Sequence, residues 1–288
     1  AMISPNTVLQ LPEIYKGNIG VISQSGSLTG TFLSRGQHRG MGFSKMVSIG
    51  NECDISVAEV GEMLIDDPKT KCIMLFLETI RDEPAFTKMV RRAYTVGKPV
   101  MVYKLGRSEA AAEFTASHTG AIAGTDSAVE AYFRHHGVVR VDQFETLLEM
   151  PNLLLGRKPR PGNRVSVITT TGGGGGMAVD RLGVAGLIAA PLPNDAVERI
   201  EAEGGMVSNG PLLDLTYKGA TTENTDRVLK EVMESEANDA AVMVVGSSAQ
   251  FNPEVSVRSL VKFAGQAKPI GGFLVPEAAE SGRMLTEA

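Results

Sequence analysis

The sequence predicts an α/β protein built from two doubly wound, parallel-sheet domains. Short β-branched or aliphatic runs alternate with amphipathic stretches, which is the pattern of βαβ units. The 288-residue chain is about twice the common domain size of roughly 150 residues. A basic, proline-rich segment, Gly156–Gly162, interrupts the alternation, which then restarts. We therefore expect one domain over residues 1–157 and a second over residues 163–288.

The first domain contains five candidate strands separated by helical stretches. The strands are expected at Ile19–Ser23, Lys45–Ile49, Cys72–Leu77, Pro99–Tyr103 and Val138–Val141. The helices are expected at Leu28–Arg35, Ser56–Ile65, Pro84–Val96 and Ser127–His136. In the second helix, the apolar residues Val57, Val60, Met63 and Leu64 are expected to share one face. Five strands with helices between them predict a flavodoxin-like sheet.

The second half of the chain repeats the opening of the first. Residues 162–176 run from a Gly-Asn pair through a strand to a glycine-rich helix start, and residues 17–26 do the same. This echo predicts a common architecture, although two generic strand–turn–helix openings would look similar. The strands here are expected at Val165–Thr169, Ala241–Val245 and Ile270–Leu274. Because Pro276–Ala288 resembles a helix with no closing strand after it, we expect the second domain to be truncated at its C-terminus.

Composition narrows the class of protein. The net charge is −5 with a pI of about 5.5, and no run of basic residues could form the stripe that nucleic acid requires. No apolar stretch reaches the roughly 18 residues of a membrane span, and no signal peptide is visible. Cys53 and Cys72 fit a reduced protein and have no metal-ligand spacing. We expect a cytoplasmic α/β enzyme or enzyme module, with no nucleic acid, membrane or metal site.

A first candidate site is the turn Ser23–Ser27, between a strand and a helix. Small residues at Ser25, Gly26 and Ser27 let backbone N–H groups point outward at the helix start, where the macrodipole contributes about half a positive charge. These residues are candidate phosphate ligands. A plain helix cap followed by a tight turn is the alternative.

A second candidate is Thr169–Gly176, which opens a helix in the second half. Its five consecutive glycines each cost about 0.5–1 kcal/mol relative to alanine inside an element, and close approach of an anion would offset that cost. Thr171, Gly172 and Gly173 are therefore candidate phosphate ligands. A dinucleotide fingerprint is met only trivially by such a run, and the absence of Gly-Lys-Ser/Thr excludes a P-loop. A flexible joint remains the alternative.

The third candidate is the long segment Leu105–Gly124, which lacks sustained periodicity. Structureless loops of this length are uncommon in compact domains unless they are functional. The segment contains His118, whereas an arbitrary histidine is more often structural. Glu78 directly follows a buried strand and could orient an imidazole at the same sheet edge. It could equally form an ion pair with Arg81 or Arg107.

Together these segments resemble the NDP-forming acyl-CoA synthetases of the succinyl-CoA synthetase superfamily. The most specific match is Ala116–Gly124, which reads Ala-Ser-His-Thr-Gly-Ala-Ile-Ala-Gly. The other matching stretches are Gly17–Gly26, Gly42–Asn51, Asp66–Lys71, Leu77-Glu78, Gly106–Glu109, Thr169–Gly176 and Asp214–Thr216. The resemblance covers nearly the whole chain.

The resemblance implies that His118 becomes phosphorylated and that Glu78 supports it. It implies that Ser117, Thr119 and Gly120 shape the histidine loop. It also implies that the helices beginning after Ser25 and Thr171 direct their N-termini at the phosphohistidine. The implied activity is that of an acid–thiol ligase: carboxylate + CoA + ATP ⇌ acyl-CoA + ADP + phosphate.

The family also has a CoA-binding Rossmann domain and an ATP-grasp domain or subunit, and neither fits in this chain. The resemblance therefore implies that the fragment alone is inactive, that CoA and ATP/ADP with Mg are substrates of the full-length enzyme, and that the enzyme is an oligomer. The acid and the choice between ADP and GDP stay open. The alternative is a regulatory module that senses CoA, acyl-CoA or another anion, but a sensor needs neither His118 nor Glu78. A simple anion- or nucleotide-binding protein would likewise not need His118.

Two departures from the family pattern affect the second anion site. Thr170–Gly175 replaces the usual Asn-Ala-Gly-Gly-Pro-Gly turn, and Asn209–Leu215 replaces the usual Asn-Pro-Val-Asp-Leu. The geometry of that site is therefore not fixed by the resemblance.

Overall fold

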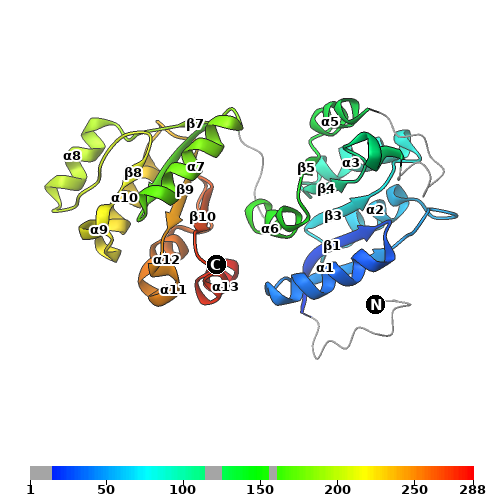
Figure 1. Cartoon of the computed structure of the whole chain (residues 1–288), viewed down its shortest axis with the longest axis horizontal. Coiled ribbons are helices and arrows are strands. Elements are labelled where there is room, and N and C mark those ends of the chain that lie inside the picture. The colour runs from blue at the N-terminus through cyan, green and yellow to red at the C-terminus, as the bar shows by residue number, and fades with distance from the viewer. Residues whose placement is uncertain (1–14, 114–124, 156–160) are drawn as a thin grey trace. The chain divides into compact units, whose positions relative to one another are not determined.

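Parallel strands run through each half of the chain in the computed structural model, which describes residues 15–113, 125–155 and 161–288 (Figure 1). The chain divides into two compact units, residues 1–158 and residues 159–288. The division falls inside the basic, proline-rich segment that the sequence marks as a linker. Among the described residues, no helix is both long and apolar enough to cross a bilayer.

The sheet of the first unit has the strand order β2-β1-β3-β4-β5, and all its pairs are parallel. The strands are β1 (Lys16–Ser23), β2 (Phe43–Ser48), β3 (Cys72–Leu77), β4 (Val100–Lys104) and β5 (Val139–Val141). This is the flavodoxin-like order, and the predicted strands are confirmed. Every residue of the central β3 is buried, which explains why its sequence is a continuous apolar run.

Helices cover both faces of this sheet (Figure 1). One face carries α2 (Val57–Asp66), α3 (Glu83–Thr95) and α5 (Asp126–His135), and the other carries α1 (Gly26–His38) and α6 (Phe144–Leu154). Ser56 and Glu59 form a capping box that fixes the start of α2. The sequence prediction missed α6. It also missed the helical turn at residues 109–113, which lies in the segment expected to be irregular.

The second unit has the order β10-β9-β6, with β7 and β8 sharing the next position. The strands are β6 (Arg164–Thr169), β7 (Ile188–Ala189), β8 (Leu213–Asp214), β9 (Ala240–Val245) and β10 (Ile270–Leu274). β7 pairs with the beginning of β6 and β8 with its end, and all pairs are parallel. The second predicted parallel-sheet domain is therefore confirmed, and two short separate strands, β7 and β8, occupy its edge beside β6.

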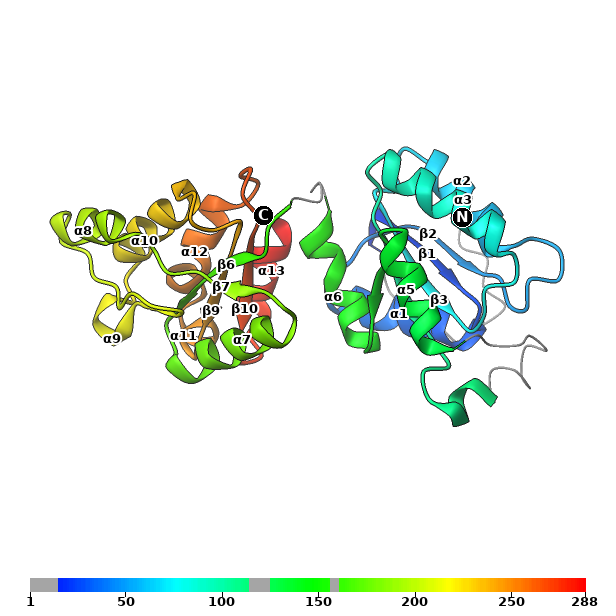
Figure 2. The same cartoon turned by 90° about the horizontal axis from the view of Figure 1, so that it is seen from above.

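Most helices of the second unit pack on one face of its sheet. That face carries α8 (Asn194–Ala202), α10 (Thr222–Glu234), α11 (Ser248–Phe251), α12 (Pro253–Phe263) and α13 (Ala279–Glu287). The other face carries α7 (Gly172–Val184), and Figure 2 shows it on the opposite side of the strands from α10 and α12. The short α9 (Thr216–Gly219) follows β8 directly. The helix expected over Pro276–Ala288 is confirmed as α13.

Two lysines, one in each unit, make equivalent hydrogen bonds and show that the two units share one architecture. Lys98 precedes β4, and its Nζ donates to the carbonyl oxygen of Ile65, 2.5 Å away near the end of α2. Lys268 precedes β10, and its Nζ donates to the carbonyl oxygen of Ser235, 2.5 Å away at the end of α10. β4 and β10 are therefore equivalent strands, each tied by a lysine to the C-terminus of an equivalent helix.

Candidate active site

The turn between β1 and α1 is built around the Ser23 hydroxyl. Ser23 Oγ donates to the Ser25 carbonyl oxygen at 2.8 Å and accepts the Ser25 N–H at 3.1 Å. The Gln24 N–H donates to the Phe76 carbonyl on β3 at 3.0 Å. The Ser23 carbonyl accepts the Ile49 N–H at 2.9 Å. The turn is thereby fixed to both neighbouring strands at the carboxyl edge of the sheet, where α/β proteins bind ligands.

The turn between β6 and α7 repeats this arrangement bond for bond. Thr169 Oγ1 donates to the Thr171 carbonyl at 2.8 Å and accepts the Thr171 N–H at 2.9 Å. The Thr170 N–H donates to the Val244 carbonyl on β9 at 3.1 Å, and the Thr169 carbonyl accepts the Leu215 N–H at 3.0 Å. Thr169, Thr170 and Thr171 thus stand where Ser23, Gln24 and Ser25 stand in the first unit. The sequence echo is a structural repeat.

Both helices that follow these turns begin without a side-chain cap. Ser25 precedes α1 and Thr171 precedes α7, and within the described structure neither side chain caps its helix by accepting a backbone N–H. By contrast, Ser56 caps α2 and Thr221 caps α10. First-turn N–H groups have no intrahelical acceptor, so the starts of α1 and α7 offer donors and a positive dipole end.

Only two of the five consecutive glycines are required by packing. A Cβ on Gly174 would lie 2.6 Å from Val275 Cγ2 and 3.1 Å from Val244 Cγ1, and one on Gly175 would lie 2.6 Å from Leu212 Cδ1. A Cβ on Gly173 or Gly176 would meet nothing within 4 Å. Gly174 and Gly175 are therefore needed for α7 to pack closely. Gly172 and Gly173 are not needed for packing, and they leave the start of the helix open.

Alanine should have opposite effects on stability at Gly174, which is packed closely, and at Gly176, which is not. Gly174→Ala should lower the free energy of unfolding by about 1–2 kcal/mol, because stiff β-branched side chains surround the site. Gly176→Ala should raise it by up to about 1 kcal/mol, because alanine favours the helix and meets no neighbour. Urea denaturation of both variants measures this. Equal effects at the two positions would contradict the packing described.

Glu78 lies at the end of β3 with its main chain held on both sides. The residue is 5% exposed. Its N–H donates to Gln24 Oε1 at 2.5 Å, and its carbonyl oxygen accepts from Lys104 Nζ at 2.7 Å. Gln24 and Lys104 are themselves buried, at 6% and 8% exposure. The carboxylate-bearing residue is therefore anchored to the ends of both β1 and β4.

The Gln24 side chain connects three loops at this edge. Its Oε1 also accepts the Thr79 N–H at 3.0 Å, and its Nε2 donates to the Thr79 carbonyl at 2.9 Å and to Glu52 Oε1 at 2.5 Å. Glu52 Oε2 accepts the Val57 N–H at the start of α2, at 2.7 Å. Glu52 holds a left-handed backbone with φ of 54°. This network links the turn after β1, the loop after β2 and the turn after β3.

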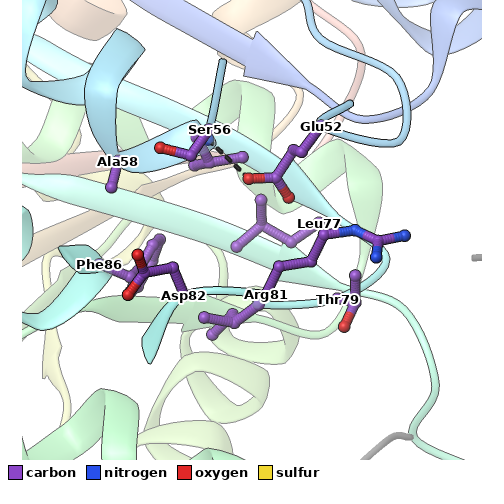
Figure 3. A pocket seen from close by; sticks show the side chains of 10 residues that line it. Glu52, Ser56, Ala58, Leu77, Thr79, Arg81, Asp82 and Phe86 are labelled. Atoms are coloured by element: carbon purple, nitrogen blue, oxygen red, sulfur yellow. Dashed lines mark hydrogen bonds between the residues drawn. The ribbon is translucent and has the colours of Figure 1, made fainter. Parts of the chain in front are cut away.

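A small pocket opens beside this network (Figure 3). Glu52 and Ser56 lie on its α2 side, and Thr79, Arg81 and Asp82 come from the turn after β3. Figure 3 shows the Arg81 guanidinium on the same side of the pocket as Glu52. The pocket therefore places a cation next to the turn that carries Glu78.

Charged residues also mark the ends of the segment that contains His118. Arg107 forms an ion pair with Asp142, and its Nε lies 3.7 Å from Asp126 Oδ2 at the start of α5. Asp126 also pairs with Arg140, whose side chain is 3% exposed. Of the two partners considered for Glu78, Arg107 is thus engaged with other carboxylates. Its contact with Asp126 brings residues 107 and 126 together.

The predicted site residues divide into those that the structure describes and those that it does not. Ser25, Gly26 and Ser27 lie at the carboxyl edge of the first sheet, as does Glu78. Thr171, Gly172 and Gly173 lie at the equivalent edge of the second. Ser117, His118, Thr119 and Gly120 lie outside the described residues, as does the whole matching stretch Ala116–Gly124.

The remaining histidines lie at helix ends. His38 is the last residue of α1, and His135 and His136 end α5, where the His136 ring lies edge-on to Tyr132. Partial burial and the neighbouring Arg91 lower the pKa of His136. In the part of the chain that the structure describes, no group of three potential metal ligands comes together.

Sequence reasoning missed Gln24 and Lys104. One signal was available for each. Gln24 is a large polar residue in a turn otherwise made of serine and glycine, and Lys104 directly ends an apolar strand, as Glu78 follows one. Because parallel strands end at a common edge, that placement already puts Lys104 near Glu78.

Comparison with known proteins agrees with this architecture. Residues 16–154 match the succinyl-CoA ligase-like flavodoxin domain. The chain is 33% identical over 270 residues to an ADP-forming acetate–CoA ligase II of Archaeoglobus fulgidus, covering 90% of this chain and 39% of that protein. It is 35% identical over 187 residues to the alpha subunit of the ADP-forming acetate–CoA ligase II of Pyrococcus furiosus, covering 65% of this chain and 40% of that protein.

A solved structure shows the same fold. It is a dinucleotide-forming acetyl-coenzyme A synthetase 1 of Candidatus Korarchaeum cryptofilum, in complex with phosphate and ADP. The TM-score is 0.77 at 24% identity, covering 95% of this chain and 64% of that one.

Residues 16–154 thus form a succinyl-CoA ligase-like flavodoxin domain. Over most of its length the chain is similar to ADP-forming acetate–CoA ligases, including the alpha subunit of one of them. It spans about two fifths of the length of the curated relatives named above.

Proposed function

We propose that this chain is the phosphohistidine-carrying core of an ATP-dependent, ADP-forming acid–CoA ligase. The observation that carries the proposal is Glu78: a buried carboxylate at the ligand edge of the first sheet, with its N–H and its carbonyl oxygen both bonded to buried side chains. The equivalent position of the second unit is Gly246, whose N–H donates to Thr170 Oγ1 at 3.2 Å. The first unit alone therefore carries a carboxylate at this place in the repeat.

In the proposed reaction, an unprotonated imidazole nitrogen of His118 attacks the γ-phosphorus of ATP. The new N–P bond forms as the bond to the β-phosphate oxygen breaks, and ADP leaves. A substrate carboxylate oxygen then takes the phosphoryl group, giving an acyl phosphate and free His118. The CoA thiolate attacks the acyl carbon and displaces inorganic phosphate. Glu78 accepts the other imidazole N–H, which keeps the attacking nitrogen unprotonated.

The starts of α1 and α7 supply stabilisation for anionic groups in this scheme. Each uncapped helix start favours a nearby anion by about 0.3–1 kcal/mol, and by up to about 2 kcal/mol when partly buried. Ser25, Gly26 and Ser27 would act in the first unit, and Thr171, Gly172 and Gly173 in the second. Ser117, Thr119 and Gly120 would shape the histidine loop.

The whole reaction needs parts beyond these two units. We propose that a CoA-binding Rossmann domain and an ATP-grasp domain or subunit complete a cytoplasmic, oligomeric enzyme that uses a small carboxylic acid, with Mg accompanying ATP. ADP rather than GDP is proposed because the relatives named above are ADP-forming ligases. The isolated 288-residue chain should not catalyse the complete ligase reaction.

The test is an assay of the complete protein with ATP, CoA and a panel of small carboxylic acids. We expect ADP, phosphate and acyl-CoA to form in equal amounts, and only when all three substrates are present. The isolated chain serves as the control and should form none. Binding of CoA or acyl-CoA without any turnover by the complete protein would contradict the proposal and indicate a sensing module.

A further inference from the structure

Lys104 is a buried lysine whose ammonium group contacts the main chain on two strands. It ends β4 and is 8% exposed. Its Nζ donates to the carbonyl oxygen of Glu78 at 2.7 Å and to that of Leu105 at 2.6 Å. Leu105 begins the segment that leads to residue 118. The ammonium therefore ties the turn bearing Glu78 to the first residue of that segment.

The internal repeat shows that the fold does not require a lysine here. Ser23 pairs with Phe76 as Thr169 pairs with Val244, so Leu77 corresponds to Val245. Leu77 pairs with Lys104, and Val245 pairs with Leu274. Leucine thus occupies the position of Lys104 in the second unit, where glycine occupies the position of Glu78. The lysine and the carboxylate are present together in one unit and absent together from the other.

The charges around Lys104 come from three elements. Glu78 follows β3, Arg140 lies on β5 and Asp126 begins α5. The pKa of Lys104 is lowered to about 8: burial is the largest cause and Arg140 acts in the same direction, while Asp126 and Glu78 oppose the shift. An unfolded chain would bind this proton up to a pH of about 10.4.

The lowered pKa of Lys104 makes the stability of the fold depend on pH. Between pH 8 and the unfolded pKa, the unfolded state binds more protons than the folded one, so stability rises with pH across this window. Below pH 8, Lys104 is charged in both states, and the burial of its ammonium group opposes folding. Burial therefore disfavours the charged form of Lys104 in the folded state, and its two bonds to carbonyl oxygens offset part of that cost.

We propose that Lys104 is a positioning residue for the phosphorylation step, holding the Glu78 turn and the start of the His118 segment in register through its ammonium group. The inference rests on the function proposed above. Charge-assisted hydrogen bonds are about twice as strong as neutral ones, so loss of the proton weakens both links. Phosphorylation should therefore slow as the pH rises through about 8, although a neutral histidine nucleophile alone would give no such loss.

The test measures the rate of phosphoenzyme formation from labelled ATP by the complete protein, between pH 6 and 10. Three variants are compared with the unchanged protein: Lys104→Leu, Lys104→Arg and Lys98→Leu. Lys98 is the matched control, because its Nζ also donates to main-chain carbonyls, including that of Asp67 at 2.8 Å, but it lies just before β4, at the opposite end of the strand from Lys104. Leucine is chosen for position 104 because Leu274 occupies the equivalent position of the second unit.

We expect Lys104→Leu to slow phosphorylation by about 10²-fold at pH 7, as a small misplacement of reacting groups does. Its KM for ATP and its thermal midpoint should stay close to those of the unchanged protein, and its alkaline loss should vanish. Lys104→Arg should keep activity at pH 9 to 10, and Lys98→Leu should keep the original pH profile.

An unchanged rate or pH profile in Lys104→Leu would overturn the inference, as would an equal loss of rate in Lys98→Leu. Absence of phosphorylation in the unchanged protein would instead refute the function proposed above, so the two failures are distinguishable.

Discussion

Replacing His118 by asparagine should abolish phosphoryl transfer to the protein. With γ-phosphate-labelled ATP, the complete protein should acquire an acid-labile, base-stable label, and His118→Asn should reduce its rate of formation by at least about 10³-fold. Asparagine retains a hydrogen-bonding side chain of similar polarity but has no nucleophilic nitrogen. The measurement is label retained on the protein after alkaline and acid treatment.

The other histidines provide the control for this experiment. His38 and His135 are exposed at the ends of α1 and α5, so His38→Asn and His135→Asn should label like the unchanged protein. If the His118→Asn protein still acquired the phosphoryl label, His118 would not be the nucleophile.

Glu78→Gln should produce the second-largest effect. Glutamine preserves the size of the side chain and leaves the main-chain bonds to Gln24 and Lys104 in place. It removes the charge that would hold the imidazole in the reactive tautomer, so we expect the rate of phosphorylation to fall by about 10²- to 10⁴-fold. Single-turnover labelling measures this rate.

Two further readouts show whether the loss is chemical. The thermal midpoint of Glu78→Gln should change little, and the exposed Glu198 on α8 offers a control variant, Glu198→Gln, with the unchanged rate. A Glu78→Gln protein that phosphorylates at the original rate would show that this carboxylate is structural.

The fold was predictable because its strands are buried on both faces. β3 and β9 appear in the sequence as continuous apolar runs of six residues, and amphipathic helices separate such runs. The separate strands β7 and β8 were missed because each has only two residues, too few for any periodicity. α6 was missed because it contains Pro151, which usually ends a helix.

The candidate site was predictable only where local sequence defines it. The starts of α1 and α7 stand out as glycine-rich turns after strands, and Glu78 stands out as a charge after an apolar run. The contacts that hold Glu78 are not local: Gln24 lies 54 residues before it and Lys104 lies 26 residues after it. Such pairs follow from strand order, which the sequence pattern alone does not supply. The sequence also gives no sign that Leu274 and Gly246 replace Lys104 and Glu78 in the repeat.

The most direct test of the account is to locate the phosphoryl group in the complete, unchanged protein. After brief exposure to ATP without CoA or acid, the protein is digested at alkaline pH and its peptides are sequenced by tandem mass spectrometry. The account predicts one phosphorylated peptide, with the phosphoryl group on His118, which disappears when ADP or CoA plus the carboxylic acid is added. A phosphoryl group on another residue, or none on a protein that still forms acyl-CoA, would contradict it.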